Sequence, residues 1–292
     1  MKIAIGWDGT DEGLDALRLG SDLSEQLGGE ITVACVIEPG MLPPEQAADR
    51  DELVKTAHDL YETARISLGG TSFEFRERLS KPVESLTEIA LEAESDLLVL
   101  GSTHLGPLGR WWPGSVAERL ESHSPCPIVV APTGYAQRRE HPAISVIGVA
   151  YDGSREARES VAVATDLAER LSAEVEVLSV APGYTSGDVP LGPLEPLRGE
   201  PTRTVERGLS QLPSALPAFG EVLEGDTAAA LEERAVELDL LVIGSRGRGP
   251  LRTRVLGSVS ADVIRTAPCP VVVVPLGSTL DEAPNAQPAA QG

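Results

Sequence analysis

The chain has 292 residues, which suggests about two domains at the ordinary size of roughly 100–200 residues per domain. Hydrophobic residues make up 41% of it, enough for ordinary cores, and a net charge of -21 with a pI near 4.5 argues against nucleic acid as a general partner. No run approaches the ~18 apolar residues of a membrane helix, the N-terminus lacks a signal-peptide pattern, and three cysteines argue against a disulfide framework. We therefore expect a cytoplasmic protein with neither nucleic-acid nor membrane partners.

The first half alternates short apolar runs with amphipathic segments, a pattern typical of βα units around a parallel sheet. Strands buried on both faces of such a sheet are rich in Val, Ile and Leu. Five segments fit this description: Ile3–Trp7, Ile31–Ile37, Thr71–Glu77, Leu97–Leu100 and Ile128–Ala131.

The second half repeats this order. Its expected strands are Ile144–Tyr151, Val175–Ala181, Ala218–Leu223, Leu240–Ile243 and Val271–Val274. A helix is expected after the first of these strands, capped by Ser154 and with apolar residues at helical spacing: Ala157, Val161, Ala164, Ala168 and Leu171. Further helices are expected at Thr202–Leu212, Thr227–Leu238 and Ser258–Thr266. The Pro- and Gly-rich segment Pro182–Pro201 is expected to be a long loop at the ligand end of the sheet or a disordered segment.

An internal repeat sets the domain organisation. Ser95–Gly134 and Leu238–Gly277 align without a gap and are identical at nearly half of their positions. We therefore expect two domains, residues 1–139 and 142–277, and a disordered tail, residues 278–292. Each domain is expected to be an α/β domain with a doubly wound, five-stranded parallel sheet of strand order 3-2-1-4-5 and helices on both faces.

The loops after the first and fourth strands are the expected binding region, because ligands of doubly wound sheets bind at the carboxyl ends of strands where the winding reverses. In the second half the fourth strand leads into Gly244-Ser245-Arg246-Gly247 and, nine residues later, Gly257-Ser258. Glycines allow close backbone approach, successive N–H groups form anion nests, and Ser258 is expected to cap a helix whose N-terminus favours phosphate. Four arginines add local positive charge suited to polyphosphate: Arg246, Arg248, Arg252 and Arg254.

The alternative is that these glycines only permit a strand–loop–helix turn. Repetition of the pattern, its place in the sheet and the arginines favour phosphate binding instead. The segment matches neither a P-loop nor a Rossmann fingerprint.

The pattern Gly244-x-x-Gly247-x9-Gly257-Ser258, between Asp239–Ile243 and Cys269–Val273, resembles the signature of the universal stress protein family, and both repeats carry a version of it. The resemblance implies ATP binding, together with Mg, at the switch point of each sheet, and a regulatory role in stress response. It also implies that the two repeats pair with each other and that the protein dimerises.

The resemblance further implies which residues contact the nucleotide. Asp152 and Asp8 are expected at its ribose–adenine end, and Val180 and Val36 against the base. The phosphates are expected at Gly244, Gly247, Gly257 and Ser258. The remaining candidates for nucleotide binding are Ser245, Arg246 and Val259 in the second repeat and Gly101, Ser102, His104, Gly114, Ser115 and Val116 in the first.

The first repeat departs from the pattern. His104 replaces the second glycine, and Trp111-Trp112-Pro113 stand where the second repeat has Arg254-Val255-Leu256. We therefore expect a weaker or altered first site. The two tryptophans are interpreted as packing residues, with a partner surface or a lid as the alternative.

Other candidates have simpler interpretations. Asp8 and Asp152 are also typical turn residues. Cys126 and Cys269 are expected to be structural, and the histidines lack metal-ligand spacing. The phosphate region shows no general base, so at most slow ATP hydrolysis or self-phosphorylation is expected. The rival hypotheses are an enzyme of the wider adenine-binding α/β superfamily, such as a nucleotidyl transferase, and a purely structural dimerisation module. The turns after the two first strands, Trp7–Thr10 and Tyr151–Ser154, lack the motifs of such an enzyme.

Overall fold

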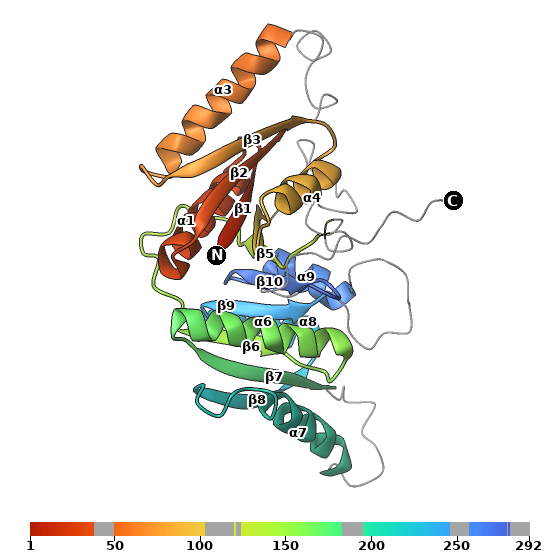
Figure 1. Ribbon diagram of the computed structural model, residues 1–292. Coiled ribbons are helices and arrows are strands. Elements are labelled where there is room, and N and C mark those ends of the chain that lie inside the picture. The colour runs from red at the N-terminus through yellow and green to blue at the C-terminus, as the bar shows by residue number, and fades with distance from the viewer. Residues whose placement is uncertain are drawn as a thin grey trace, which may run out of the picture.

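A computed structural model describes residues 1–37, 50–102, 120, 124–182, 195–245, 257–278 and 280. Ten strands form one sheet in the order β3-β2-β1-β4-β5-β10-β9-β6-β7-β8 (Figure 1). The strands of the first repeat are β1 (Lys2–Trp7), β2 (Glu30–Ile37), β3 (Phe73–Leu79), β4 (Leu97–Gly101) and β5 (Ile128–Ala131). Those of the second are β6 (Val146–Ala150), β7 (Glu174–Pro182), β8 (Ala218–Gly225), β9 (Leu240–Gly244) and β10 (Val271–Val274).

Each repeat therefore has the expected strand order 3-2-1-4-5, and the predicted fold class is confirmed. All strand pairs within a repeat are parallel. The two repeats meet at the antiparallel pair β5–β10, where Val129 lies opposite Val272. These strands are buried throughout, as expected for apolar runs covered on both faces.

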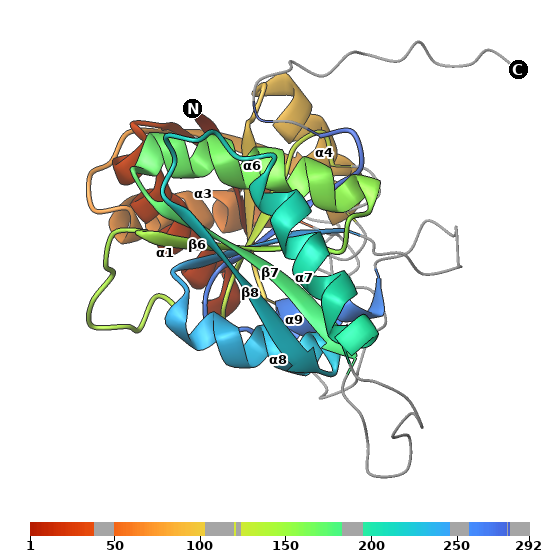
Figure 2. The same cartoon turned by 90° about the horizontal axis from the view of Figure 1, so that it is seen from below.

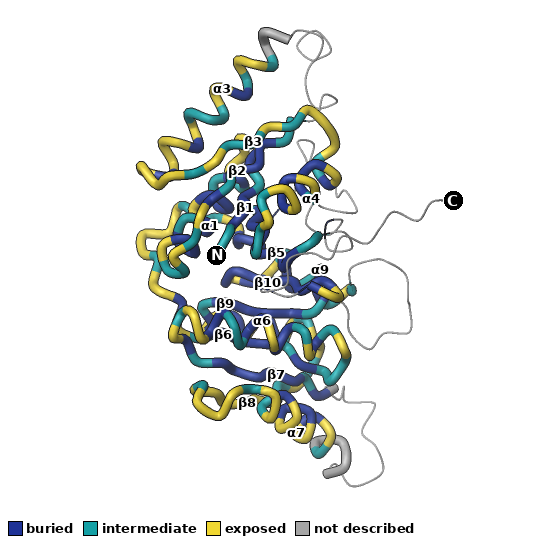
Figure 3. Tube along the Cα trace, in the orientation of Figure 1, coloured by how far each residue is buried: buried dark blue, intermediate teal, exposed yellow. Residues whose placement is uncertain are grey.

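Helices cover both faces of the sheet. One face carries α1 (Asp11–Leu27), α3 (Arg50–Ser67), α6 (Arg155–Leu171) and α7 (Glu195–Leu209), and the other carries α4 (Pro82–Glu92), α8 (Thr227–Arg234) and α9 (Ser258–Thr266). Figure 2 shows α6 and α7 on one side of β7 and β8, with α8 and α9 on the other. The strands near the seam are buried, whereas the helices expose their outer faces (Figure 3).

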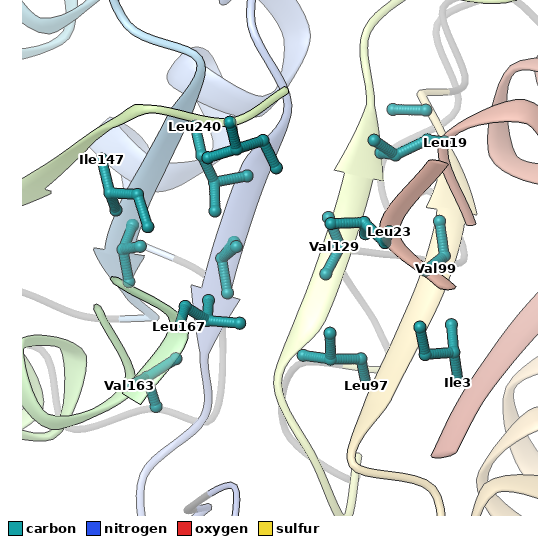
Figure 4. Packing of buried hydrophobic residues seen from close by; sticks show 14 of the residues in the cluster. Ile3, Leu19, Leu23, Leu97, Val99, Val129, Ile147, Val163, Leu167 and Leu240 are labelled. Carbon is teal, nitrogen blue, oxygen red and sulfur yellow. The ribbon is translucent and has the colours of Figure 1, made fainter. Parts of the chain in front are cut away.

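Each face holds one apolar cluster, and each cluster contains residues of both repeats. Figure 4 labels members of the cluster beneath α1 and α6: Ile3, Leu19, Leu23, Leu97, Val99 and Val129 from the first repeat, and Ile147, Val163, Leu167 and Leu240 from the second. The seam between the repeats is therefore part of the core.

The first helix of each repeat begins at a hydroxyl cap. Thr10 Oγ1 accepts the Gly13 N–H at 3.1 Å, and Ser154 Oγ accepts the Ala157 N–H at 3.1 Å, which confirms the predicted cap at Ser154. Each cap satisfies one of the backbone donors that a helix N-terminus leaves without an intrahelical partner.

Several predicted boundaries were wrong. The segment Pro182–Pro201 was expected to be a loop, but α7 begins at Glu195 and contains Pro201. Gly and Pro lower helix propensity, yet Val205 is buried in the core and Leu209 packs against it, so tertiary contacts stabilise this helix. The helix expected at Thr227–Leu238 ends at Arg234 and continues as a 3₁₀ turn, Ala235–Glu237.

Both repeats hold the chain in the same way after their fifth strand. In the first repeat, the buried carboxylate of Asp15 on α1 accepts the Gly134 N–H at 2.8 Å. In the second, Glu159 on α6 accepts the Gly277 N–H at 2.8 Å. After repeat 1, Tyr135 and His141 also contact Asp22 of α1, so the connection to repeat 2 is anchored on repeat 1.

Candidate functional site

The switch point of repeat 2 lies at β6, which pairs with β7 on one side and β9 on the other. Ala150 lies opposite Leu178 of β7, and Val149 lies opposite Val242 of β9. Continuing these registers places Asp152 level with Val180 and with Ser245. Three residues predicted to contact a ligand therefore form one row at the carboxyl ends of neighbouring strands, where doubly wound sheets bind ligands.

Repeat 1 has the same row. Trp7 lies opposite Cys35 of β2, and Ile5 lies opposite Val99 of β4. Continuing the registers places Asp8 level with Val36 and with Ser102. Burial, with smaller contributions from the carboxylates of Glu77 and Asp8, raises the pKa of the neighbouring Cys35 thiol to about 12. This thiol is therefore not a nucleophile at neutral pH.

The two aspartates each organise a tight turn. Asp152 Oδ1 accepts the Ser154 N–H at 2.8 Å, and Asp8 Oδ1 accepts the N–H and the hydroxyl of Thr10 at 3.1 and 2.6 Å. The residue that follows each aspartate is a glycine: Gly153 has a φ of +78° and Gly9 a φ of +86°. Positive φ values of this size favour glycine. The turn role is therefore present at both aspartates, and it fixes each carboxylate at the edge of its sheet.

The start and the end of the Gly-rich segment of repeat 2 are joined by hydrogen bonds. Ser245, only 3% exposed, donates its N–H to Val274 O of β10 at 3.1 Å, and its carbonyl accepts the Gly257 N–H at 3.1 Å. The buried Ser260 of α9 donates its hydroxyl to Gly244 O at 3.0 Å. These bonds hold the end of β9 against the first turn of α9.

The expected cap at Ser258 is wrong, because Gly257 is the N-cap residue of α9 and Ser258 is already the first helical residue. Among the described residues, no side chain caps this helix, so its first turn presents backbone N–H groups without a side-chain acceptor. Ser258 is exposed, whereas Val259 packs against the core. The positive end of the helix dipole favours an anion at this point.

The corresponding strand end of repeat 1 is built differently. A Cβ atom at Gly101 would lie 2.0 Å from the Glu12 carbonyl oxygen, so the close approach of β4 to α1 requires glycine there. Ser102 donates its N–H to Ala131 O at 3.1 Å, as Ser245 does in repeat 2, but its hydroxyl lies 3.0 Å from that of Thr133.

Several predicted contact residues lie outside the described part of the chain. These are His104, Gly114, Ser115 and Val116 in repeat 1, and Arg246 and Gly247 in repeat 2. The remaining loop arginines and the tryptophan pair lie outside it too: Arg248, Arg252, Arg254, Trp111 and Trp112.

Ser260 was not predicted as part of the site. Its position in an amphipathic helix gives no signal by itself, but the aligned repeats differ there, with Ala117 in repeat 1. Within the described residues, no group of three or more His, Cys, Asp or Glu side chains is arranged to hold a metal ion. Nor does any helix in those stretches have the length and apolar character needed to cross a membrane.

The fold and the edge described above define a tandem of doubly wound α/β domains, and in repeat 2 the described residues place the N-terminus of α9 at the end of β9. Comparison with known proteins identifies the family. The model of the universal stress protein family matches residues 1–132 and 144–275, and this chain belongs to that family.

Two curated relatives come from Mycobacterium tuberculosis. Universal stress protein Rv2005c is 32% identical over 197 residues, which span 66% of this chain and 66% of the relative. Universal stress protein Rv2623 is 25% identical over 288 residues, 93% of this chain and 91% of the relative. A crystal structure of a universal stress protein from Archaeoglobus fulgidus superimposes with a TM-score of 0.67 at 20% identity, covering 94% of this chain and 97% of that one, and so shows the same fold.

Proposed function

We propose that this protein binds ATP, with Mg, at the switch point of its sheets and acts as a regulatory protein of the stress response. One observation carries the proposal: in repeat 2, hydrogen bonds hold the uncapped N-terminus of α9 at the end of β9, in line with Asp152 and Val180. An apolar side chain, a carboxylate and a helix N-terminus in this order suit a base, a ribose and a phosphate chain.

Each part of the edge has a separate task in this proposal. The N–H groups of the first turn of α9 and the exposed Ser258 hydroxyl donate to phosphate oxygens. Asp152, held by its turn, accepts from ribose hydroxyls, and Val180 gives apolar contact to the base. On a chain of net charge -21, a local excess of backbone donors is needed to hold an anionic ligand.

We propose a regulatory role because the sequence predicts no general base beside the phosphates. ATP then alters the protein by binding one conformation better than another, and a partner reads the difference. We propose a cytoplasmic location and a homodimer of tandem chains, each with its own nucleotide. The three buried, unpaired cysteines suit a reducing compartment.

The direct test is nucleotide retention and binding. Protein purified without added nucleotide is extracted with acid, and the extract is separated by chromatography; the same protein is titrated with Mg-ATP by calorimetry. We expect adenine nucleotide in the extract or saturable binding in the titration. If the extract contains none and the titration and the melting temperature show no response to Mg-ATP, the proposal is refuted.

Gly257→Glu locates the site. The backbone at Gly257 has φ -61° and ψ 144°, which any L residue adopts, so the variant should fold. Its carboxylate would stand where a phosphate is expected, and like-charge contact of several kcal/mol predicts at least a roughly tenfold loss of affinity. Gly199→Glu is the matched control, because a side chain there meets nothing within 4 Å. Equal affinities of the two variants would place the nucleotide elsewhere.

A further inference from the structure

The end of β9 is fixed by Ser260. Its side chain is 5% exposed, and its hydroxyl lies 3.0 Å from Gly244 O and 3.5 Å from Ser245 O. In the described residues, Ser67 and Ser160 each donate to a carbonyl of their own helix, Ser160 to Glu156 O. Ser260 instead reaches out of its helix to the preceding strand.

The bond fixes a peptide group at both of its ends. The peptide between Gly244 and Ser245 has its carbonyl held by Ser260 and its N–H held by Val274 O. A peptide group is planar, so two such contacts set its orientation. The next carbonyl, that of Ser245, is held by Gly257 N–H and approached by Ser260 as well.

These contacts matter for an anion because they direct acceptors toward the protein. Carbonyl oxygens at a strand end repel phosphate when they face it. Here the carbonyls of Gly244 and Ser245 both face α9, where they accept hydrogen bonds from the Ser260 hydroxyl and the Gly257 N–H. The donors of the uncapped α9 N-terminus are left to the ligand, in a position set before it arrives, which lowers the ordering cost of binding.

Repeat 1 lacks this device. The same alignment that matches Gly114 with Gly257 places Ala117 at the position of Ser260. Its strand end is held instead through the Ser102 and Thr133 hydroxyls, which lie 3.0 Å apart. In repeat 2, Leu276 occupies the position of Thr133. Repeat 1 therefore has the pair of hydroxyls, and repeat 2 has the bond from the helix serine to the strand carbonyl.

We propose that Ser260 is a positioning residue that orients the end of β9 for phosphate binding and makes repeat 2 the tighter nucleotide site. This inference rests on the proposed function. Ser260→Ala removes one buried hydrogen bond and leaves the ligand to order the end of β9, so the dissociation constant of the tight site for Mg-ATP should rise roughly two- to tenfold. Ser260→Thr keeps the hydroxyl and should restore affinity.

Ser160→Ala is the matched control, because this serine is fully buried and donates at the same 3.0 Å to a carbonyl away from the strand end. Calorimetric titration with Mg-ATP and the melting temperature without nucleotide are measured for all variants. We expect Ser160→Ala to leave the affinity for Mg-ATP unchanged, and the melting temperatures show how far each variant alters stability by itself. If Ser260→Ala does not fold, Ser260→Cys replaces it, since a thiol donates only weakly.

The outcomes separate the two proposals. Wild-type protein that binds no nucleotide refutes the proposed function and this inference together. Wild-type binding with an unchanged dissociation constant in Ser260→Ala, or equal losses in Ser260→Ala and Ser160→Ala, refutes the inference and leaves the proposed function standing. A selective loss restored by Ser260→Thr supports it.

Discussion

A buried carboxylate away from the ligand edge gives the sharpest stability prediction. Glu176 of β7 is fully buried and is paired with Arg234 of α8, with the Nε–Oε1 distance 2.9 Å and the Nη2–Oε2 distance 2.7 Å. Arg234 also contacts Glu221 at 3.1 Å and Glu237. Burial raises the pKa of Glu176 from its ordinary 4.5, the nearby Glu221 raises it further, and Arg234 opposes both.

Arg234→Met removes the cation and leaves the buried carboxylate alone. A buried charge without a partner costs several kcal/mol, and Glu176 avoids that cost by taking up a proton. Holding a proton above the ordinary pKa costs 1.36 kcal/mol per pH unit. We therefore expect Arg234→Met to reduce the free energy of unfolding by several kcal/mol at pH 7 and by much less at pH 5, where protonation of Glu176 costs little.

The sign follows from the raised folded pKa. The stability that protonated Glu176 contributes is complete below the ordinary pKa and is lost as the pH rises through the folded value. Glu176→Gln cannot titrate, so in the Arg234→Met background it should restore most of the stability at pH 7 and little at pH 5.

Denaturant unfolding followed by circular dichroism at both pH values measures these differences. Arg170→Met is the control, because Arg170 pairs with Asp166 on an exposed helix surface and its loss should cost no more than about 1 kcal/mol at either pH. A loss in Arg234→Met that is the same at pH 5 and pH 7, or no larger than the control, would show that the reasoning about Glu176 is wrong.

Two further predictions concern packing. Burial raises the pKa of each cysteine thiol to about 12, so Ellman's reagent at pH 8 should label almost none of the three in the native protein and all of them in denaturant; rapid native labelling would contradict this. Gly101→Ala places a Cβ 2.0 Å from backbone and should lower the free energy of unfolding by about 1–3 kcal/mol, whereas Gly199→Ala, in open space on a helix, should not destabilise; equal denaturation midpoints would refute this.

The strand order and both apolar cores were predictable because short runs of Val, Ile and Leu repeat at regular intervals, and parallel strands buried on both faces leave this pattern. The row of Asp152, Val180 and Ser245 follows from the same information, since each lies within two residues of the end of a predicted strand. These features depend on local sequence and on one topological rule.

What could not be predicted depends on contacts between segments distant in sequence. Nothing in the local sequence distinguishes Asp15 and Glu159 from other acidic helix residues, but both hold the chain after the fifth strand. Pro201 was expected to lie in a loop, but it is part of α7, because the packing of this helix against the core outweighs the low helix propensity of proline. The sequence predicted Ser258 as the N-cap residue of α9, but the structure places the N-cap one residue earlier, at Gly257. Only the backbone angles distinguish the two positions.

The antiparallel seam determines how the two ligand edges relate. Between β1 and β6 lie β4, β5, β10 and β9, so the two switch points are five strand spacings apart, roughly 24 Å at about 4.8 Å each. Because β5 and β10 run in opposite directions, the carboxyl ends of the two strand sets also point opposite ways at the seam. Under the proposed function, one nucleotide could not span both edges, so each repeat would have to complete its own site. The differences between the repeats, Ser260 against Ala117 and Leu276 against Thr133, would then change the affinity of one proposed site without altering the other.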